Sequence, residues 1–405
     1  MHLIWSADDR LNLVQKATEL KPAIQRLDGV DVLRGLSILA VVLLHILIRF
    51  SFSHVRLGLD WPKYTRHFLF LNGGNGVTVF FAVSGFLITL TSLRRFGSLA
   101  AMRLRVFYRI RFARIMPLLL LLLAVLSVLH LLRVDGYVIQ TKIFTLPRAL
   151  LAALTFHLNW LEASRNAYLP ACWTVLWSLS IEEMFYLFFP LACVVLLRWK
   201  VGAWLWIGLA LAFVVMGPFA RTIWSKTDLA QENSYLAGMA SIALGCLTAW
   251  VADYLSRRDH SVKRVWLNAS LAAGWALILL IAIWPRWRVM ELLGKSGLDD
   301  TLLALGTCLV MLATALRGAR GHWWSTLFRW FGRHSYEVYL SHEFVVIAGV
   351  ALYARWYGHG TSRAVVAAFV VAMVAATAPL GWLLARWFAE PMNRMLRGAA
   401  PPRPV

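Results

Sequence analysis

Long runs of apolar residues recur along this chain, separated by short polar gaps rich in arginine. A helix needs about 20 apolar residues to cross the hydrocarbon core of a bilayer. Backbone polar groups must be satisfied internally there, so we expect these runs to be helices. The pattern predicts an all-α fold, a polytopic transmembrane helical bundle of about ten spans. The predicted spans cover residues 33–52, 74–93, 115–133, 172–197, 201–220, 234–254, 265–285, 300–316, 330–354 and 364–389.

One further apolar run, residues 146–161, is shorter than a span requires. We interpret it as interfacial or re-entrant, because counting it as a span would reverse every later helix and move the basic stretch 257–264 to the other side. The gaps leave no room for an appended soluble module. We therefore predict one integral membrane domain over residues 1–400, followed by a disordered tail at 401–405.

Composition supports this assignment and excludes another. The chain is 60% hydrophobic and 15% charged, whereas soluble domains carry about 25% charged residues. The net charge of +21 would suit a nucleic-acid partner, but the basic residues lie between the spans and form no single patch. They instead place both termini in the cytoplasm by the positive-inside rule. The four cysteines fall inside predicted spans as packing residues, and no metal site is expected.

The first span contains two ionisable side chains, whose burial in a membrane costs free energy. Arg34 and His45 are eleven residues apart, close to three whole turns, so both lie on one helix face. The rise separates them by roughly 16 Å, about half of the hydrocarbon thickness. The pair predicts a cation at the cytoplasmic mouth in register with an imidazole near the midplane. The alternative is a snorkelling arginine and a histidine bonded to a neighbouring helix.

Two adjacent carboxylates, Glu182 and Glu183, interrupt the fourth span. They point about 100° apart, so one can line a cavity while the other pairs elsewhere. A buried carboxylate beside an imidazole can orient it and raise its basicity. The alternative is a structural ion pair with an arginine of another helix.

Three other segments carry candidate chemistry. Arg111 and Arg114, in the predicted loop before the third span, share a helix face and suit phosphate recognition, or else serve only as a topology signal. The glycines of 72–87 allow close approach of a helix or a ligand. In the ninth span His342 either lines a reaction cavity or packs structurally.

Taken together, these segments resemble the acyltransferase-3 family of membrane acyltransferases, over roughly residues 27–391. The chain departs from the family pattern at Thr78, where Asp is frequent, and at Glu343-Phe344, where Trp-Pro is usual. The matching segments, in order, are Arg34 with His45, Gly76 to Leu87, Arg111 with Arg114 before Pro117, Trp177 to Glu182, and Gly332 to His342.

The resemblance implies transfer of an acyl group, by default acetyl, from acyl-CoA to a hydroxyl of a cell-surface or lipid-linked carbohydrate. It also implies a multi-pass protein of a bacterial-type inner membrane. We expect His45 to act as general base or covalent acyl carrier and Glu182 to orient it. The remaining candidates are Arg34, Arg111 and Arg114 for the donor phosphates, and Ser84, Trp177 and His342 for substrate binding or the cavity wall.

A rival hypothesis is a secondary transporter or flippase for a surface-glycan precursor, with His45 and Glu182 as a proton relay. The sequence shows no inverted repeat and no matching pair of broken spans, which weighs against it. A glycan polymerase or ligase usually needs a large extracytoplasmic loop, and the longest such gap here, 134–171, is modest.

Overall fold

The structure is a computed structural model that describes residues 27–53, 63–223, 227–257, 262–283, 288–318, 321–358 and 362–398. These residues form helices and connecting turns, with no strand among them. Ten helices in this part of the chain are long and apolar enough to cross a membrane, which confirms the predicted fold class and number of spans. The tail predicted at 401–405 lies outside the described residues.

The ten candidate spans are built on the long helices, some of them extended by a short neighbouring helix. They are α2 (Asp28–Phe52), α4 (Gly73–Phe96), α5 (Leu104–Leu131), α8 (Leu176–Leu196), α9 (Gly202–Thr222), α11 (Tyr235–Arg257), α12 (Arg264–Ile283), α14 (Leu298–Arg317), α16 (Ser335–Tyr357) and α17 (Arg363–Leu384).

Short helices connect or cap these spans. They are α3 (Lys63–Phe70), α6 (Leu146–Leu154), α7 (Leu158–Arg165), η1 (Ala171–Trp173), α10 (Asp228–Glu232), α13 (Arg288–Ser296), η2 (Trp323–Ser325), α15 (Thr326–Arg333), a π-helical turn η3 (Ala385–Ala389) and α18 (Glu390–Arg397).

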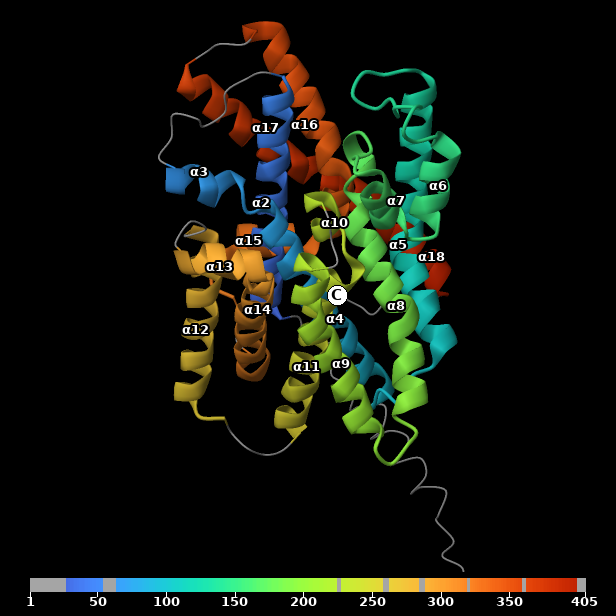
Figure 1. Ribbon diagram of the computed structural model, residues 1–405, viewed down its shortest axis with the longest axis vertical. Helices are drawn as coiled ribbons and strands as arrows, with labels where there is room; N and C mark the ends of the chain where they lie inside the picture. Colours follow the sequence, from blue (N-terminus) through green and yellow to red (C-terminus); the bar gives the residue numbers. More distant parts are fainter. Residues whose placement is uncertain are drawn as a thin grey trace, which may run out of the picture.

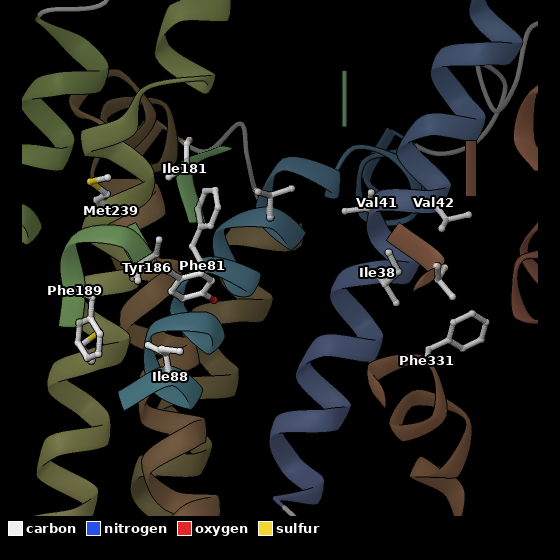
Figure 2. Close-up of a cluster of buried hydrophobic side chains, with 14 of the residues drawn as sticks. Ile38, Val41, Val42, Phe81, Ile88, Ile181, Tyr186, Phe189, Met239 and Phe331 are labelled. Carbon is white, nitrogen blue, oxygen red and sulfur yellow. The ribbon is translucent and has the colours of Figure 1, made fainter. Parts of the chain in front are cut away.

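Helix α4 is the most deeply buried of the ten candidate spans. It packs against α2, α11 and α14, and Figure 1 shows α12 and α14 on one side of the molecule and α5 and α8 on the other. The main apolar core joins α2, α4 and α11 through buried side chains such as Ile38, Phe81 and Met239 (Figure 2). The centre of the bundle is therefore α4, which lies between α2 and α11.

Glycines allow a close helix crossing between α4 and α11. A Cβ on Gly85 would lie 1.9 Å from the carbonyl oxygen of Ile242, and one on Gly245 would lie 2.0 Å from that of Ala82. Gly76 likewise sits against the backbone of Ser37. The glycines of the second span therefore serve helix packing, which was one of the two alternatives that the sequence left open.

Two predicted boundaries were wrong. The third span begins at Leu104 and not at 115, so Arg111 and Arg114 lie inside a helix and not in a loop. The ninth span is divided at His334, because α15 ends at Arg333 and α16 starts at Ser335. The first error arose because arginines that face a polar cavity lower the local hydropathy without ending the helix. The second arose because hydropathy does not show a break between two consecutive helices.

The run at 146–161 forms parts of two short helices, α6 and α7, neither long enough to span. On α7 the buried carboxylate of Glu162 accepts hydrogen bonds from the backbone N–H of Leu169 (2.8 Å) and the side-chain amide of Asn233 (3.3 Å). Burial raises the pKa of Glu162 to about 8. This carboxyl joins the 146–169 segment to the chain beside α10.

Candidate functional site

Helices α2 and α16 lie side by side, and two polar contacts fix their register. Near the start of both helices, Arg34 donates a hydrogen bond to the hydroxyl of Ser335 (2.8 Å). Further along, Arg49 donates two bonds to the carboxylate of Glu343, each 3.0 Å long. The two helices therefore run parallel over this stretch, and residues near His45 face those near Glu343.

The imidazole of His45 lies between its own helix backbone and the carboxylate of Glu343. Its Nδ1 is 2.8 Å from the carbonyl oxygen of Val41. A carbonyl only accepts, so neutral His45 carries its proton on Nδ1 and leaves Nε2 as the basic atom. That Nε2 is 3.7 Å from Oε1 of Glu343. A carboxylate at this distance stabilises the imidazolium that forms when Nε2 takes a proton.

A second imidazole, that of His342, meets the first edge to face, with ring centroids 4.9 Å apart. Its Nδ1 lies 2.8 Å from the carbonyl oxygen of Tyr339, so this ring too carries its proton on Nδ1. The side chain is fully buried. Its Nε2 has no hydrogen-bond partner among the described residues, which leaves a second buried lone pair next to His45.

A cavity of about 320 Å³ opens beside this pair of helices. Residues of α2, α4, α5, α8 and α16 form its wall, and most of its apolar side chains come from α4. Its polar wall residues are Arg34, Ser84, Thr91, Arg111, Arg114, Ser178, Glu182, Tyr186, Ser335, Tyr336 and Tyr339.

The two glutamates of the fourth span divide their roles as the sequence allowed. Glu182 lines the cavity, where its cationic neighbours are Arg111, Arg34 and Arg114. Glu183 forms an ion pair with Arg111 (3.7 Å). The guanidinium of Arg111 also lies over the ring of Tyr186, 3.7 Å from its centroid, a favourable cation–π geometry. Arg111 is thus held by α8 as well as facing the cavity.

The structure brings together some of the predicted site residues and separates others. Arg34, Arg111, Arg114, Glu182 and Ser84 line one cavity. His45 is not part of that wall, and the carboxylate in contact with it is that of Glu343, not Glu182. The expected pairing of Glu182 with His45 is therefore not what this arrangement shows.

Two further cavity candidates lie elsewhere. Trp177 and His342 are not among the residues that line this cavity. Trp177 packs edge to face against Phe81, with centroids 6.2 Å apart, and His342 lies behind the wall beside His45.

The ring of Tyr339 lies in the cavity wall and next to His342. Tyr339 lines the cavity, and its ring centroid is 6.0 Å from that of His342. Its hydroxyl donates to the carbonyl oxygen of Val175 (2.9 Å) and shares a second bond with the hydroxyl of Ser178 (2.6 Å). The tyrosine is therefore anchored to α8 at the point where the cavity ends.

Sequence reasoning did not assign roles to Arg49, Tyr339 and Glu343. Glu343 gave a signal, because it replaces the usual Trp of the resembled motif with an acid in the middle of a span. Thr78, where the resembled family often has Asp, gave a second signal. Its hydroxyl donates to the carboxylate of Asp300 on α14 (3.0 Å). A carboxylate therefore does lie next to position 78, but a different helix supplies it. Asp300 is itself paired with Arg221.

This arrangement defines a polytopic membrane protein with a polar intramembrane cavity beside a buried pair of imidazoles. The chain matches the sequence model of the acyltransferase domain family over residues 27–386 and belongs to that family. No solved structure matches the chain.

Curated relatives carry related names. The chain is 26% identical to the peptidoglycan O-acetyltransferase OatA of Listeria monocytogenes over 78% of this chain and 48% of that protein. It is 24% identical to the O-acetyltransferase OatA of Staphylococcus aureus, over 79% of this chain and 51% of that one. A protein of Staphylococcus aureus (strain COL), given O-acetyltransferase as a provisional name, is 30% identical over 44% of this chain and 27% of its own length. The matched segment thus spans about half or less of these relatives.

Proposed function

We propose that this protein is a membrane O-acetyltransferase that moves an acetyl group from acetyl-CoA to a hydroxyl of a cell-surface or lipid-linked carbohydrate. The observation that carries the proposal is the cavity walled by Arg34 and Arg114 that ends one ring away from His342 and His45. Membership of the acyltransferase family and the names of the relatives support the same chemistry.

The donor enters the cavity from the end of α2 where Arg34 lies, which the positive-inside rule assigns to the cytoplasm. Guanidinium groups bind phosphate oxygens in charge-assisted hydrogen bonds. The thioester lies farther in, along the roughly 16 Å of helix between Arg34 and His45. Since Tyr339 stands between the cavity and the imidazoles, its side chain swings aside for the acyl group to reach them.

Transfer replaces a carbon–sulfur bond with a carbon–oxygen bond. The acceptor oxygen attacks the thioester carbonyl as Nε2 of His45 takes the hydroxyl proton. Collapse of the intermediate expels the thiolate, which receives that proton, so atoms and charges balance. Glu343 stabilises the imidazolium in between, and Arg49 holds Glu343 in place. In the covalent variant of this scheme, Nε2 of His45 attacks the thioester carbonyl and expels the thiolate. The acceptor hydroxyl then attacks the acyl-imidazolium, which releases neutral His45, and the hydroxyl proton passes to the thiolate.

The acceptor approaches the same imidazole, that of His45. The side chain of His45 is 16% exposed, whereas Glu343 is 1% exposed. Because His45 is not part of the wall of the donor cavity, this exposure gives the acceptor a separate approach. The two substrates then meet at one imidazole from different directions.

The test uses purified protein in lipid nanodiscs with acetyl-CoA labelled in the acetyl group. Wild-type protein is expected to bind the donor and to release free thiol slowly without acceptor, and His45→Gln to bind it but release none. A His45→Gln protein that is correctly folded and releases thiol at the wild-type rate would refute the assignment. Analysis of surface glycans in cells lacking the protein then identifies the acceptor by its missing ester.

A further inference from the structure

The face of α2 that carries His45 continues toward the outer end of the helix. Arg49 and Phe52 follow His45 at spacings of four and seven residues, so the three side chains share one helix face. Phe52 lies roughly 10 Å beyond His45 along the helix axis. It stands at the end of α2 that the positive-inside rule places outside the cell. A stripe of side chains therefore leads from the outer surface to the imidazole of His45.

Arg49 has hydrogen-bond donors that its ion pair does not use. Its Nε and Nη2 bind the carboxylate of Glu343, which leaves both N–H groups of Nη1 and one of Nη2. With the carboxylate on the Nε and Nη2 side, Nη1 points away from Glu343. It has no hydrogen-bond partner among the described residues. The guanidinium can therefore bind an oxygen of a second molecule without releasing Glu343.

The unused donors face a polar space. The side chains of His45 and Arg49 are 16% and 18% exposed, whereas Glu343 behind them is buried. Ionisable groups inside a span almost always face a water-filled space or other protein groups, and not lipid. Because Glu343 holds the guanidinium at its own depth in the membrane, Arg49 does not extend toward the headgroups. Its exposed side therefore lines the approach to Nε2 of His45.

Aromatic rings flank this guanidinium. The exposed ring of Phe52 has its centroid 5.8 Å from the guanidinium carbon of Arg49. Tyr137, in the loop between α5 and α6, stacks on Phe344 with ring centroids 5.7 Å apart. Its charged neighbours are Glu343 and Arg49. Aromatic faces pack against the C–H faces of sugar rings, and planar polar groups beside them bind the sugar oxygens.

We propose that Arg49, Phe52 and Tyr137 form the acceptor subsite and that the acceptor presents a sugar ring to it. This proposal rests on the proposed function. Nη1 of Arg49 donates to an oxygen of the sugar, and the ring of Phe52 packs on the apolar face of the sugar. One hydroxyl of the same sugar then reaches Nε2 of His45 and gives up its proton there in the transfer step described above. Arg49 is thus a positioning residue for the acceptor.

The ratio of ester formed to thiol released tests this subsite. Membranes from cells that lack the native protein and carry one variant receive acetyl-CoA labelled in the acetyl group. Alkali-labile label in the envelope measures transfer, and free thiol, corrected for membranes without the protein, measures consumption of the donor. A defect in folding or donor binding lowers both quantities and keeps their ratio. A poorly held sugar lets water take the acetyl group, which lowers the ratio.

Two substitutions should lower this ratio and one should not. Arg49→Lys keeps a charge for Glu343 but lacks the planar fork, so its ratio is expected to fall at least tenfold. Phe52→Leu keeps an apolar side chain without a ring, and its ratio should fall roughly threefold to tenfold. Phe219→Leu is the matched control, because Phe219 is also an exposed ring near the outer end of a span, α9. It should keep the wild-type ratio.

Chemical modification from outside tests the same approach without removing a hydrogen bond. The four native cysteines are buried, so a membrane-impermeant methanethiosulfonate should modify an introduced thiol selectively. Right-side-out vesicles are loaded with labelled acetyl-CoA and then treated with this reagent. In Phe52→Cys vesicles the reagent is expected to block transfer of acetyl to the envelope. In Phe219→Cys vesicles it should modify the protein and leave transfer unchanged.

The proposal is overturned if either Arg49→Lys or Phe52→Leu keeps the wild-type ratio, or if Phe219→Leu lowers it as much. It is also overturned if modified Phe52→Cys protein transfers acetyl at the unmodified rate. A labelled product that contains no sugar would show that the acceptor is of another class, and the proposal would be wrong. Wild-type membranes that form no envelope ester would instead refute the proposed function.

Discussion

Nε2 of His45 and Oε1 of Glu343 lie 3.7 Å apart across the interface of α2 and α16. The carboxylate sits on the side of the basic nitrogen, not behind Nδ1, which is occupied by the carbonyl oxygen of Val41. The orientation of this imidazole is therefore set by its own helix. The carboxylate acts on the charge that the ring acquires when it takes a proton.

Glu343→Gln should lower kcat roughly 10- to 100-fold, because the developing imidazolium loses its counter-charge. The amide keeps the shape of the carboxylate, and the donor cavity is not altered, so the KM for acetyl-CoA should stay within twofold. Steady-state kinetics of purified protein measure both quantities.

Arg49→Gln provides the matched control for this variant. It removes the same ion pair but leaves the carboxylate beside His45, so it should lose stability comparably and activity less. Equal losses of kcat in the two variants would show that Glu343 acts only through the fold.

The ring of Tyr339 should limit passage between the donor cavity and His45. Tyr339→Phe removes the bonds to Val175 and Ser178 that hold the ring across the path, so kcat should be unchanged or higher. Tyr339→Trp places a larger ring there and should lower kcat by at least tenfold without raising donor KM. A tryptophan variant with normal turnover would mean that the acyl group takes another route.

Much of the fold was predictable, because a span reveals itself by hydropathy alone. What hydropathy could not give is where a helix continues through charged residues. Arg111 and Arg114 suggested a loop, yet both lie inside α5. Arg111 pairs there with Glu183, and both arginines line the cavity. His334 interrupts the ninth span for a reason that is equally invisible in one dimension: α15 must cross α2, with Gly332 against the backbone of Asp31.

The sequence predicted several residues that line one cavity, but not the contacts that these residues make. Which carboxylate meets His45 depends on the register of two helices. The hydrogen bond from Arg34 to Ser335 fixes how the two helices lie along each other. His45 is eleven residues beyond Arg34 on α2, and Glu343 is eight residues beyond Ser335 on α16. The helical rise therefore places His45 and Glu343 roughly 4 Å apart along the helix axes. No pattern in a single sequence supplies that first contact, so Glu182 was paired with His45 in error.

The crossing of α4 and α11 should tolerate no side chain at Gly85. A Cβ there would lie 1.9 Å from a backbone oxygen of Ile242, which cannot move without separating the helices. Gly85→Ala should destabilise the protein by about 3 kcal/mol or more. Gly74→Ala is the matched control on the same helix, because nothing lies within 4 Å of its Cβ position. The fraction of folded monomer in size-exclusion chromatography should fall for the first variant only, and a wild-type fraction for Gly85→Ala would contradict the crossing.

Glu162 should make the stability of the protein depend on pH between about 4.5 and 8. Its folded pKa, raised by burial to about 8 from an ordinary 4.5, means that the folded state holds a proton that the unfolded chain releases. Stability is therefore greatest below about pH 4.5 as far as this group is concerned. It declines between 4.5 and 8 by at most about 1.4 kcal/mol per pH unit, and is level above 8.

Burial raises the pKa of Glu162 against the opposing hydrogen bonds from Leu169, Thr174 and Asn233. Glu232 of α10 adds a negative charge, and Oδ1 of both Asn159 and Asn233 is buried without a partner among the described residues. A protonated Glu162 can donate to one of these oxygens, whereas the carboxylate cannot. Glu162→Gln supplies the same donor at every pH, so its thermal midpoint between pH 5 and 8 should be flatter than that of wild type and higher at pH 8. If wild type and Glu162→Gln follow the same pH profile, the buried carboxyl is already ionised in the folded protein.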